Sequence, residues 1–392
     1  METVRHLIVR PNFIADTLEA KLEAIRIAVG TAEAAPIAER ERKIYVLWNK
    51  GHWAASYVKS IGTPNVLGVP MPSVSRIRVR AGDLDVACHE VGQGPLVLLC
   101  HGFPELGFSW RHQLGALADA GFRAVAPDLR GYGDTAGPAE PEDCSFDRLI
   151  NDLVSLVAAL GEQQAVLVGH DFGAFLAWHA AAVRPDIFTR VACLSVPYPT
   201  FLMGTDAPTK VLLKRIGSED HYILYFQRIG GPEAELEADV ADTLLRTYWS
   251  SSGEEPDAEP FAAAMPRGSG FLAGTRRPSR IPSWLTEDEL AVYVDAFKRR
   301  GFAGPLAWYR AIDSSWENLA RWRDAKVSQP ALFMIGACDP LLAATTGLRK
   351  RMLSLVPRLS KEIILPGCGH WVQQERPLEV NRALTEFLSE SL

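Results

Sequence analysis

The most constraining feature of this chain is a glycine-flanked aspartate between a short apolar run and an alanine-rich stretch. Residues 165–168 are apolar and predict a buried strand, and residues 174–183 predict a helix. Between them the sequence reads Gly-His-Asp-Phe-Gly at positions 169–173. Small residues two positions before and after the central one allow a sharp turn from strand to helix. We therefore expect Asp171 at the tip of such a turn, with its carboxylate exposed to a substrate.

Aspartate at this position changes the chemistry, because the usual occupant of such a turn is serine. A serine that attacked saturated carbon would leave a stable ether. A carboxylate that attacked saturated carbon would leave an ester, which water can hydrolyse. Asp171 therefore indicates substrates opened by displacement at sp3 carbon, such as epoxides and alkyl halides.

Short strands alternate with helices on both sides of this turn. This alternation predicts a mostly parallel central sheet flanked by helices, an α/β fold. The predicted strands are 76–80, 83–90, 96–100, 124–126, 165–168, 191–196, 331–335 and 362–365, and the predicted helices are 145–160, 174–183, 347–355 and one from 377. The alternation stops between about 198 and 322, where the sequence predicts a helical insertion with a capping box at Thr286 and Glu289.

The chain accordingly divides into four predicted parts. Residues 1–72 form an N-terminal arm, helical in part; residues 73–197 and 326–392 form the two parts of the core; and residues 198–325 form a helical cap or lid. The arm packs on the body in the simplest interpretation. A dimerisation element or a partial cover of the substrate entrance remains an alternative.

Composition excludes several classes of function. A net charge of −6 gives no basic surface for nucleic acid or anionic membranes, and no apolar run reaches the ~18 residues of a membrane helix. The six cysteines are scattered without metal-ligand spacing, which predicts a reduced, cytoplasmic protein without disulfides, metal or cofactor. Cys88, Cys100 and Cys193 lie in apolar runs and are predicted core residues.

Polar residues after other predicted strands complete a candidate catalytic set. The loop 101–104 reads His-Gly-Phe-Pro; the backbone N–H groups of Phe103 and Phe172 are candidates for an oxyanion hole, since Pro104 has no N–H. His370 is placed to act as a general base, and Asp339 to orient it. Taken singly, each pattern has an ordinary alternative, namely a His-Gly turn, a surface histidine and an Asp-Pro turn.

Tyrosines of the insertion could supply the acid. A phenol can hydrogen-bond an epoxide oxygen and protonate it as the ring opens. Tyr222 and Tyr309 are the candidates, but spacing alone does not separate them from Tyr225, Tyr248 and Tyr293, and packing is the commoner role of tyrosine in helices. Further candidates for the substrate pocket are His101, Pro104, Trp110, Trp308 and Trp371.

Ordered blocks of the chain resemble the epoxide hydrolases of the α/β-hydrolase superfamily, over roughly residues 74–390. The blocks are the loop 101–105 with Ser109, Trp110 and Arg111, the segment 128–133, the turn 169–173, the lid segments 222–227 and 304–310, and the histidine loop 369–377. The resemblance implies an α/β-hydrolase fold with a lid. It also implies Asp171 as the nucleophile, His370 as the base, Asp339 as its partner, and Tyr222 and Tyr309 as the acid pair. The implied substrates are a small hydrophobic epoxide and water, and a homodimer is left open.

Three alternatives are weighed against this interpretation. A dehalogenase shares the aspartate, but these enzymes typically carry tryptophan or arginine after the nucleophile, and Phe172 offers no donor for a halide. An ester hydrolase is disfavoured because an aspartate attacking an ester would give an anhydride. A non-catalytic binding protein need not retain the nucleophile, base, acid and both tyrosines.

Overall fold

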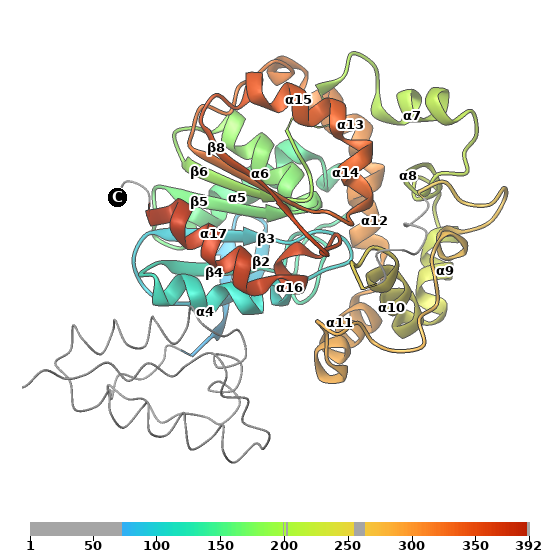
Figure 1. Cartoon of the computed structure of the whole chain (residues 1–392), viewed down its shortest axis with the longest axis horizontal. Coiled ribbons are helices and arrows are strands. Elements are labelled where there is room, and N and C mark those ends of the chain that lie inside the picture. Colours follow the sequence, from blue (N-terminus) through green and yellow to red (C-terminus); the bar gives the residue numbers. More distant parts are fainter. Residues whose placement is uncertain (1–72, 199, 201–202, 255–262, 390–392) are drawn as a thin grey trace, which may run out of the picture. The chain divides into compact units, whose positions relative to one another are not determined.

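The computed structural model describes residues 73–198, 200, 203–254 and 263–389 (Figure 1). The chain separates into two units, Met1–Met71 and Pro72–Leu392. The N-terminal arm predicted for residues 1–72 lies outside the described residues, and its role stays a prediction.

An eight-stranded sheet in the order β1-β2-β4-β3-β5-β6-β7-β8 lies at the centre of the larger unit. The strands β1 and β2 form an antiparallel hairpin, β2 pairs antiparallel with β4, and the other pairings are parallel. This confirms the predicted mostly parallel sheet. The strands are β1 Ser75–Ala81, β2 Leu84–Val91, β3 Leu96–Cys100, β4 Arg123–Pro127, β5 Ala165–His170, β6 Phe188–Leu194, β7 Ala331–Gly336 and β8 Leu359–Leu365.

Alternate residues of each parallel strand enter two different cores, as the pleat requires. In β3, Leu96, Leu98 and Cys100 belong to the core beneath α5 and α6, whereas Val97 and Leu99 belong to the core beneath α4 and α17. The core-sheet helices are α4 Arg111–Asp119, α5 Phe146–Ala159, α6 Phe172–Val183, α14 Pro340–Ala344, α15 Thr346–Leu355, α16 Val372–Glu375 and α17 Pro377–Ser389.

Two strands depart from their predicted bounds. The strand predicted at 362–365 is β8, which already begins at Leu359. The strand predicted at 191–196 is β6, which begins at Phe188 and ends at Leu194. The next residue, Ser195, has a φ of 69°, which turns the backbone out of the extended conformation. The strand therefore ends two residues earlier than the apolar run suggests.

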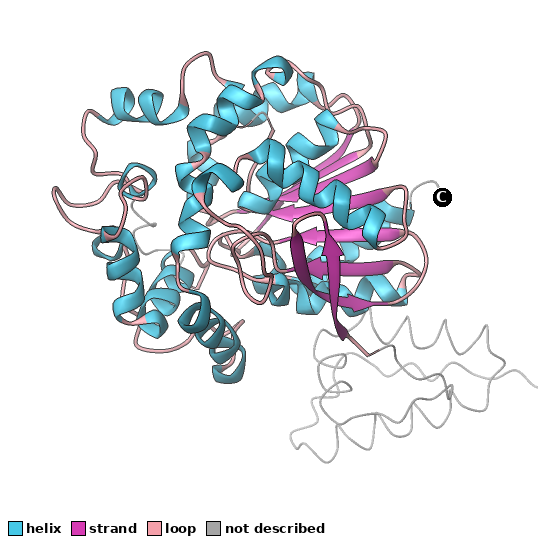
Figure 2. Cartoon of the chain, turned by 180° about the vertical axis from the view of Figure 1, so that it is seen from behind, coloured by secondary structure: helices cyan, strands magenta, loops and turns pink. Residues whose placement is uncertain are grey.

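A helical insertion lies between β6 and β7, as the loss of alternation predicts. Its helices are α7 Pro208–Ile216, α8 Tyr222–Tyr225, α9 Gly231–Ala238, α10 Val240–Ser250, α11 Glu287–Arg300, α12 Ala303–Arg310 and α13 Ile312–Asn318. The capping box of Thr286 and Glu289 opens α11 as predicted. Figure 2 shows the insertion at the side of the sheet toward which the parallel strands point.

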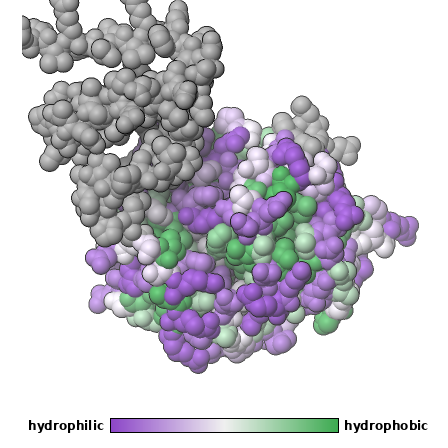
Figure 3. Space-filling view, turned by 90° about the horizontal axis from the view of Figure 1, so that it is seen from below, coloured by the Kyte–Doolittle hydropathy of each residue, from purple (hydrophilic) through white to green (hydrophobic). Residues whose placement is uncertain are grey.

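The described surface is mixed in polarity. On the face seen in Figure 3, hydrophobic residues gather in the middle and hydrophilic residues surround them. Among the described helices, none combines the length and apolar character that crossing a bilayer requires. Cys88, Cys100 and Cys193 are buried, in agreement with the prediction, and all six cysteines are free thiols.

Candidate active site

The predicted strand-to-helix turn places Asp171 between β5 and α6. Its backbone has φ 51° and ψ −120°, a conformation that ordinary residues rarely adopt. A side chain at Gly169 would lie 2.2 Å from the carbonyl oxygen of Gly173, and one at Gly173 would lie 2.1 Å from that of Cys100. Both positions therefore require glycine, because the turn brings backbone against backbone.

The loop after β3 holds the Asp171 carboxylate by a backbone group. The N–H of Phe103 donates to Asp171 Oδ1 at 2.9 Å. A Cβ atom at Gly102 would lie 2.4 Å from the Cβ of Asp171, so glycine is needed there as well. One carboxylate oxygen is thus fixed by the loop and the other is left for the imidazole.

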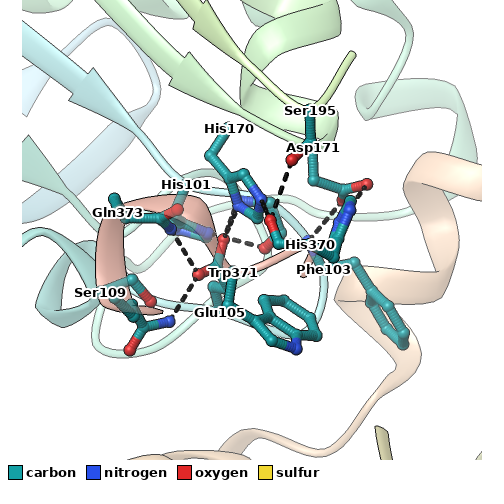
Figure 4. Close-up of polar contacts among 12 residues, drawn as sticks. His101, Phe103, Glu105, Ser109, His170, Asp171, Ser195, His370, Trp371 and Gln373 are labelled. Carbon is teal, nitrogen blue, oxygen red and sulfur yellow. Dashed lines mark hydrogen bonds and ion pairs between the residues drawn. The ribbon is translucent and has the colours of Figure 1, made fainter. Parts of the chain in front are cut away.

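His370 follows β8 and Asp339 follows β7, and the sheet brings both close to the turn at Asp171. Figure 4 shows the His370 ring beside the Asp171 carboxylate. Nδ1 of His370 lies 3.0 Å from Asp339 Oδ2, and Nε2 lies 3.5 Å from Asp171 Oδ2. The side chain of Asp339 also accepts the N–H of Leu341, which caps α14. The imidazole therefore stands between two carboxylates.

Burial and neighbouring charges shift the pKa values of Asp171 and His370 in opposite directions. Burial acts to raise the pKa of Asp171, but hydrogen bonding and the charge of His370 lower it below its usual value. Burial acts to lower the pKa of His370, but Asp339 and Asp171 raise it well above its usual value. The two groups consequently favour an imidazolium beside an ionised nucleophile.

Tyr222 of α8 and Tyr309 of α12 come together, with ring centroids 6.1 Å apart. The ring of Tyr309 stands edge-on to Phe172 at 4.6 Å and to Phe103 at 5.3 Å. Burial raises the pKa of both phenols, and the charge of Asp171 raises it further. Both tyrosines therefore keep the proton that a hydrogen-bond donor needs.

The other three tyrosines have hydroxyl partners elsewhere. Tyr248 donates to the carbonyl of Pro104 at 2.8 Å, and the Tyr293 hydroxyl lies 2.9 Å from Ser109 Oγ. A hydrogen bond to Glu235 contributes to the raised pKa of Tyr225. These contacts place the three hydroxyl groups in other surroundings, and the roles of Tyr222 and Tyr309 stay predictions.

Comparison with known proteins agrees with this geometry. The family model described as the alpha/beta hydrolase fold matches residues 95–377. Epoxide hydrolase A of Mycobacterium tuberculosis is 42% identical over 298 residues, which cover 75% of this chain and 90% of the relative. The chain belongs to the epoxide hydrolase family of the α/β-hydrolase superfamily.

Solved structures of the epoxide hydrolase family show the same fold. Epoxide hydrolase A from Mycobacterium thermoresistibile matches with a TM-score of 0.76 at 40% identity, covering 81% of this chain and 99% of that one. An epoxide hydrolase from an endophytic Streptomyces matches with a TM-score of 0.76 at 42% identity, covering 82% and 96%. The resemblance inferred from the motifs is confirmed.

The five residues predicted to line the substrate pocket lie in surroundings that differ from one residue to the next. The loop residues make backbone contacts: Nε2 of His101 accepts the N–H of Leu129 at 3.0 Å, and the Pro104 carbonyl receives Tyr248. Trp110 is buried in the core beneath α4 and α17. As pocket residues, these three stay predictions.

Two tryptophans lie beside catalytic candidates. Trp308 packs 5.8 Å from the Phe172 ring and donates to the carbonyl of Arg130. Trp371 packs 5.0 Å from the His370 ring and donates to the carbonyl of Tyr248. Each indole is therefore oriented by a backbone acceptor; whether either ring touches substrate stays a prediction.

A buried network behind the site escaped the sequence analysis. Glu105 accepts the N–H of Gly102 and lies 2.6 Å from His170 Nδ1, and it also accepts the side chains of Gln373 and Gln374. Burial acts to raise the pKa of Glu105, but His170 and the Gly102 N–H lower it overall. Glu105 and His170 belong to quoted motifs, but they are 65 positions apart. No local spacing could have paired them.

Among the described residues, no group of three or more His, Cys, Asp and Glu side chains is arranged to hold an ion.

Proposed function

We propose that this protein hydrolyses epoxides to vicinal diols, with Asp171 as the nucleophile and His370 as the base. The observation that carries the proposal is the division of labour between the two Asp171 oxygens. The Phe103 N–H binds Oδ1, while Oδ2 faces His370. Membership of the epoxide hydrolase family supports it.

In the first half of the cycle, Oδ2 of Asp171 attacks an epoxide carbon and the C–O bond of the ring breaks. Tyr222 and Tyr309 hold the epoxide oxygen, and one of them donates its proton as negative charge develops there. The product of this step is a hydroxyalkyl ester of Asp171. The lowered pKa of Asp171 supports this role, because the nucleophile must be ionised.

In the second half, water attacks the carbonyl carbon of the ester and His370 takes its proton. The oxyanion develops on Oδ1, where the N–H of Phe103 already binds, and Phe172 is the proposed second donor. When this intermediate collapses, the bond between the carbonyl carbon and the alkoxide oxygen breaks. The proton of the added hydroxyl passes to the alkoxide, which restores the carboxylate and releases the diol. Asp339 stabilises the imidazolium formed on His370.

The protons balance if His370 begins the cycle protonated, as its raised pKa favours. Ester formation removes the charge of Asp171, so one of the two carboxylates that raise the pKa of His370 is lost. The imidazolium then gives its proton through water to the tyrosinate. The neutral imidazole that results is ready to act as the base.

We also propose that the helical insertion, residues 198–325, acts as a cap over the site. Support comes from Tyr222 and Tyr309 and from the N–H of His370, which donates to the carbonyl of Ser251 at 2.7 Å. A small hydrophobic substrate fits the aromatic rings around Tyr309. Cytoplasmic location, a homodimer and the absence of nucleic-acid binding stay predictions.

Product analysis tests the proposed activity. Parent protein and Asp171→Ala are each offered aryl and alkyl epoxides beside chloro- and bromoalkanes. We expect diol from the parent protein and none from the variant. Halide release without diol would move the assignment to a dehalogenase. Equal diol from both proteins would remove Asp171 from the mechanism.

A further inference from the structure

The carbonyl oxygen of His370 is held by side chains from two other elements (Figure 4). Nε2 of His170 lies 2.8 Å from this oxygen, and the hydroxyl of Ser195 donates to it at 2.9 Å. Within the loop, the N–H of Val372 also donates to it at 2.9 Å. His170 and Ser195 are fully buried. Three protein groups therefore hold this carbonyl in place.

Ser195 holds an unfavourable backbone conformation while it makes this bond. Asp171 and Ser195 are the two non-glycine residues with positive φ in the described part of the chain. A non-glycine residue in this region is destabilised by the contact between its Cβ atom and the backbone. Glycine would avoid that cost, but it has no hydroxyl to offer His370.

The position of Ser195 at the end of β6 explains how its hydroxyl can contact the His370 carbonyl. It directly follows β6, and its N–H donates to the carbonyl of Met334 in β7 at 2.8 Å. The left-handed turn ends the strand and leaves the hydroxyl directed at the loop that follows β8. Ser195, at the end of β6, thus holds the loop that follows β8.

We propose that Ser195 is a positioning residue for the hydrolytic half of the reaction, and this inference rests on the proposed function. Its hydroxyl fixes the His370 carbonyl, which keeps the imidazole between Asp339 and Asp171. Ester formation does not use His370 as a base, whereas ester hydrolysis does. Loss of the hydroxyl therefore slows the second half-reaction selectively.

Single-turnover measurements with Ser195→Gly and Ser195→Ala test the proposal. Protein in excess is mixed with an epoxide that the parent protein hydrolyses, and quenched samples are analysed for diol and, by intact mass, for the ester adduct. We expect adduct formation within about twofold of the parent and hydrolysis slowed about 10-fold, so that the adduct accumulates. Ser195→Gly removes the backbone cost together with the hydroxyl, so the test survives if Ser195→Ala folds poorly.

Ser315→Ala is the matched control. Ser315 is fully buried; its hydroxyl accepts the N–H of Phe146 and bonds the carbonyl of Ala311, away from the catalytic residues. We expect this variant to lose stability but to keep the parental ratio of the two half-reactions. If the loss of any buried hydroxyl were enough to slow ester hydrolysis, Ser315→Ala would change the ratio of the two half-reactions as much as the Ser195 variants do.

The outcomes separate this inference from the proposed function. If Ser195→Gly hydrolyses the adduct as fast as the parent, or slows both half-reactions equally, Ser195 does not position His370. If the parent protein forms neither adduct nor diol from any epoxide of the panel, both proposals are overturned.

Discussion

Asp339 and Asp171 both raise the pKa of His370, so the charge of Asp171 should influence the protonation of the imidazole. Both carboxylates beside the imidazole raise its pKa, so removing one must lower it. We expect Asp171→Asn, which resembles the neutral ester, to lower the pKa of His370 relative to the parent protein. An NMR titration of the labelled imidazole measures this, with Asp186→Asn at an exposed ion pair as the control. An unchanged or higher pKa would contradict the proposed route of the proton.

Gly102 provides the space that the nucleophile occupies. A methyl group at this position would lie 2.6 Å from Asp171 Oδ1. We expect Gly102→Ala to cost about 1–3 kcal/mol of unfolding free energy and to slow ester formation about 100-fold, because the carboxylate must move. Denaturant unfolding and single-turnover kinetics measure the two effects.

Gly115 is the control for that substitution. It lies within α4, and a methyl group there meets nothing within 4 Å. Gly115→Ala should therefore stabilise the protein by roughly 0.5–1 kcal/mol and leave the kinetics unchanged. If Gly102→Ala behaved like Gly115→Ala, the loop would not constrain the nucleophile.

The positions of the candidate catalytic residues at strand ends could be predicted from the sequence. Asp171, Asp339 and His370 follow strands that the apolar pattern identifies, and parallel strands bring such residues to one edge. Glu105, His170 and Ser195 contribute through packing between distant segments, and Ser195 also depends on a backbone conformation that no local pattern signals. These roles required the structure.

Two helices of the insertion supply the proposed acid. We expect Tyr222→Phe and Tyr309→Phe each to slow ester formation about 100-fold, because each keeps its ring and loses its donor. Hydrolysis of the preformed ester should change little. Tyr225→Phe, whose hydroxyl faces Glu235, is the control and should resemble the parent in single-turnover assays. Parental ester formation in both variants would exclude the tyrosines as acids.

Helix α11 gains stability from its capping box. The Thr286 hydroxyl accepts the N–H of Glu289, and the Glu289 carboxylate accepts the N–H of Thr286. We expect Thr286→Ala to lower the unfolding free energy by about 1 kcal/mol, with Thr286→Ser close to the parent. Thermal unfolding of the three proteins decides this, and equal stability of all three would show that tertiary contacts hold the helix start.

Elements were predictable to different degrees. Strands buried on both faces need continuous apolar runs, so the sequence locates them well. The turn at Ser195 explains why β6 ends two residues before the apolar run does. The insertion is recognisable as helical, but the sequence around each of its tyrosines is alike in being helical and does not show which of them lie near Asp171. Which of them approach Asp171 depends on how α8 and α12 pack.

The larger unit as a whole joins one rigid sheet to one helical insertion. The loops after the sheet strands carry the proposed nucleophile Asp171, the proposed base His370 and its partner Asp339. The insertion carries Tyr222 and Tyr309, whose rings lie close to each other and, for Tyr309, to Phe172. Trp371 and Tyr248 link the two, because the indole donates to the carbonyl of Tyr248 while the Tyr248 hydroxyl donates to Pro104. The proposed first half-reaction therefore draws on side chains from both parts.

The most direct measurement is a single turnover in water enriched in heavy oxygen (18O), with protein in excess over an epoxide. Water attacks the ester carbonyl in the proposed cycle, so the label should enter the carboxylate of Asp171 while the first diol remains unlabelled. Mass analysis of the peptide that contains Asp171, and of the diol, reads both positions. Label in the diol with none in Asp171 would mean that water attacks the epoxide directly, and would contradict a covalent intermediate.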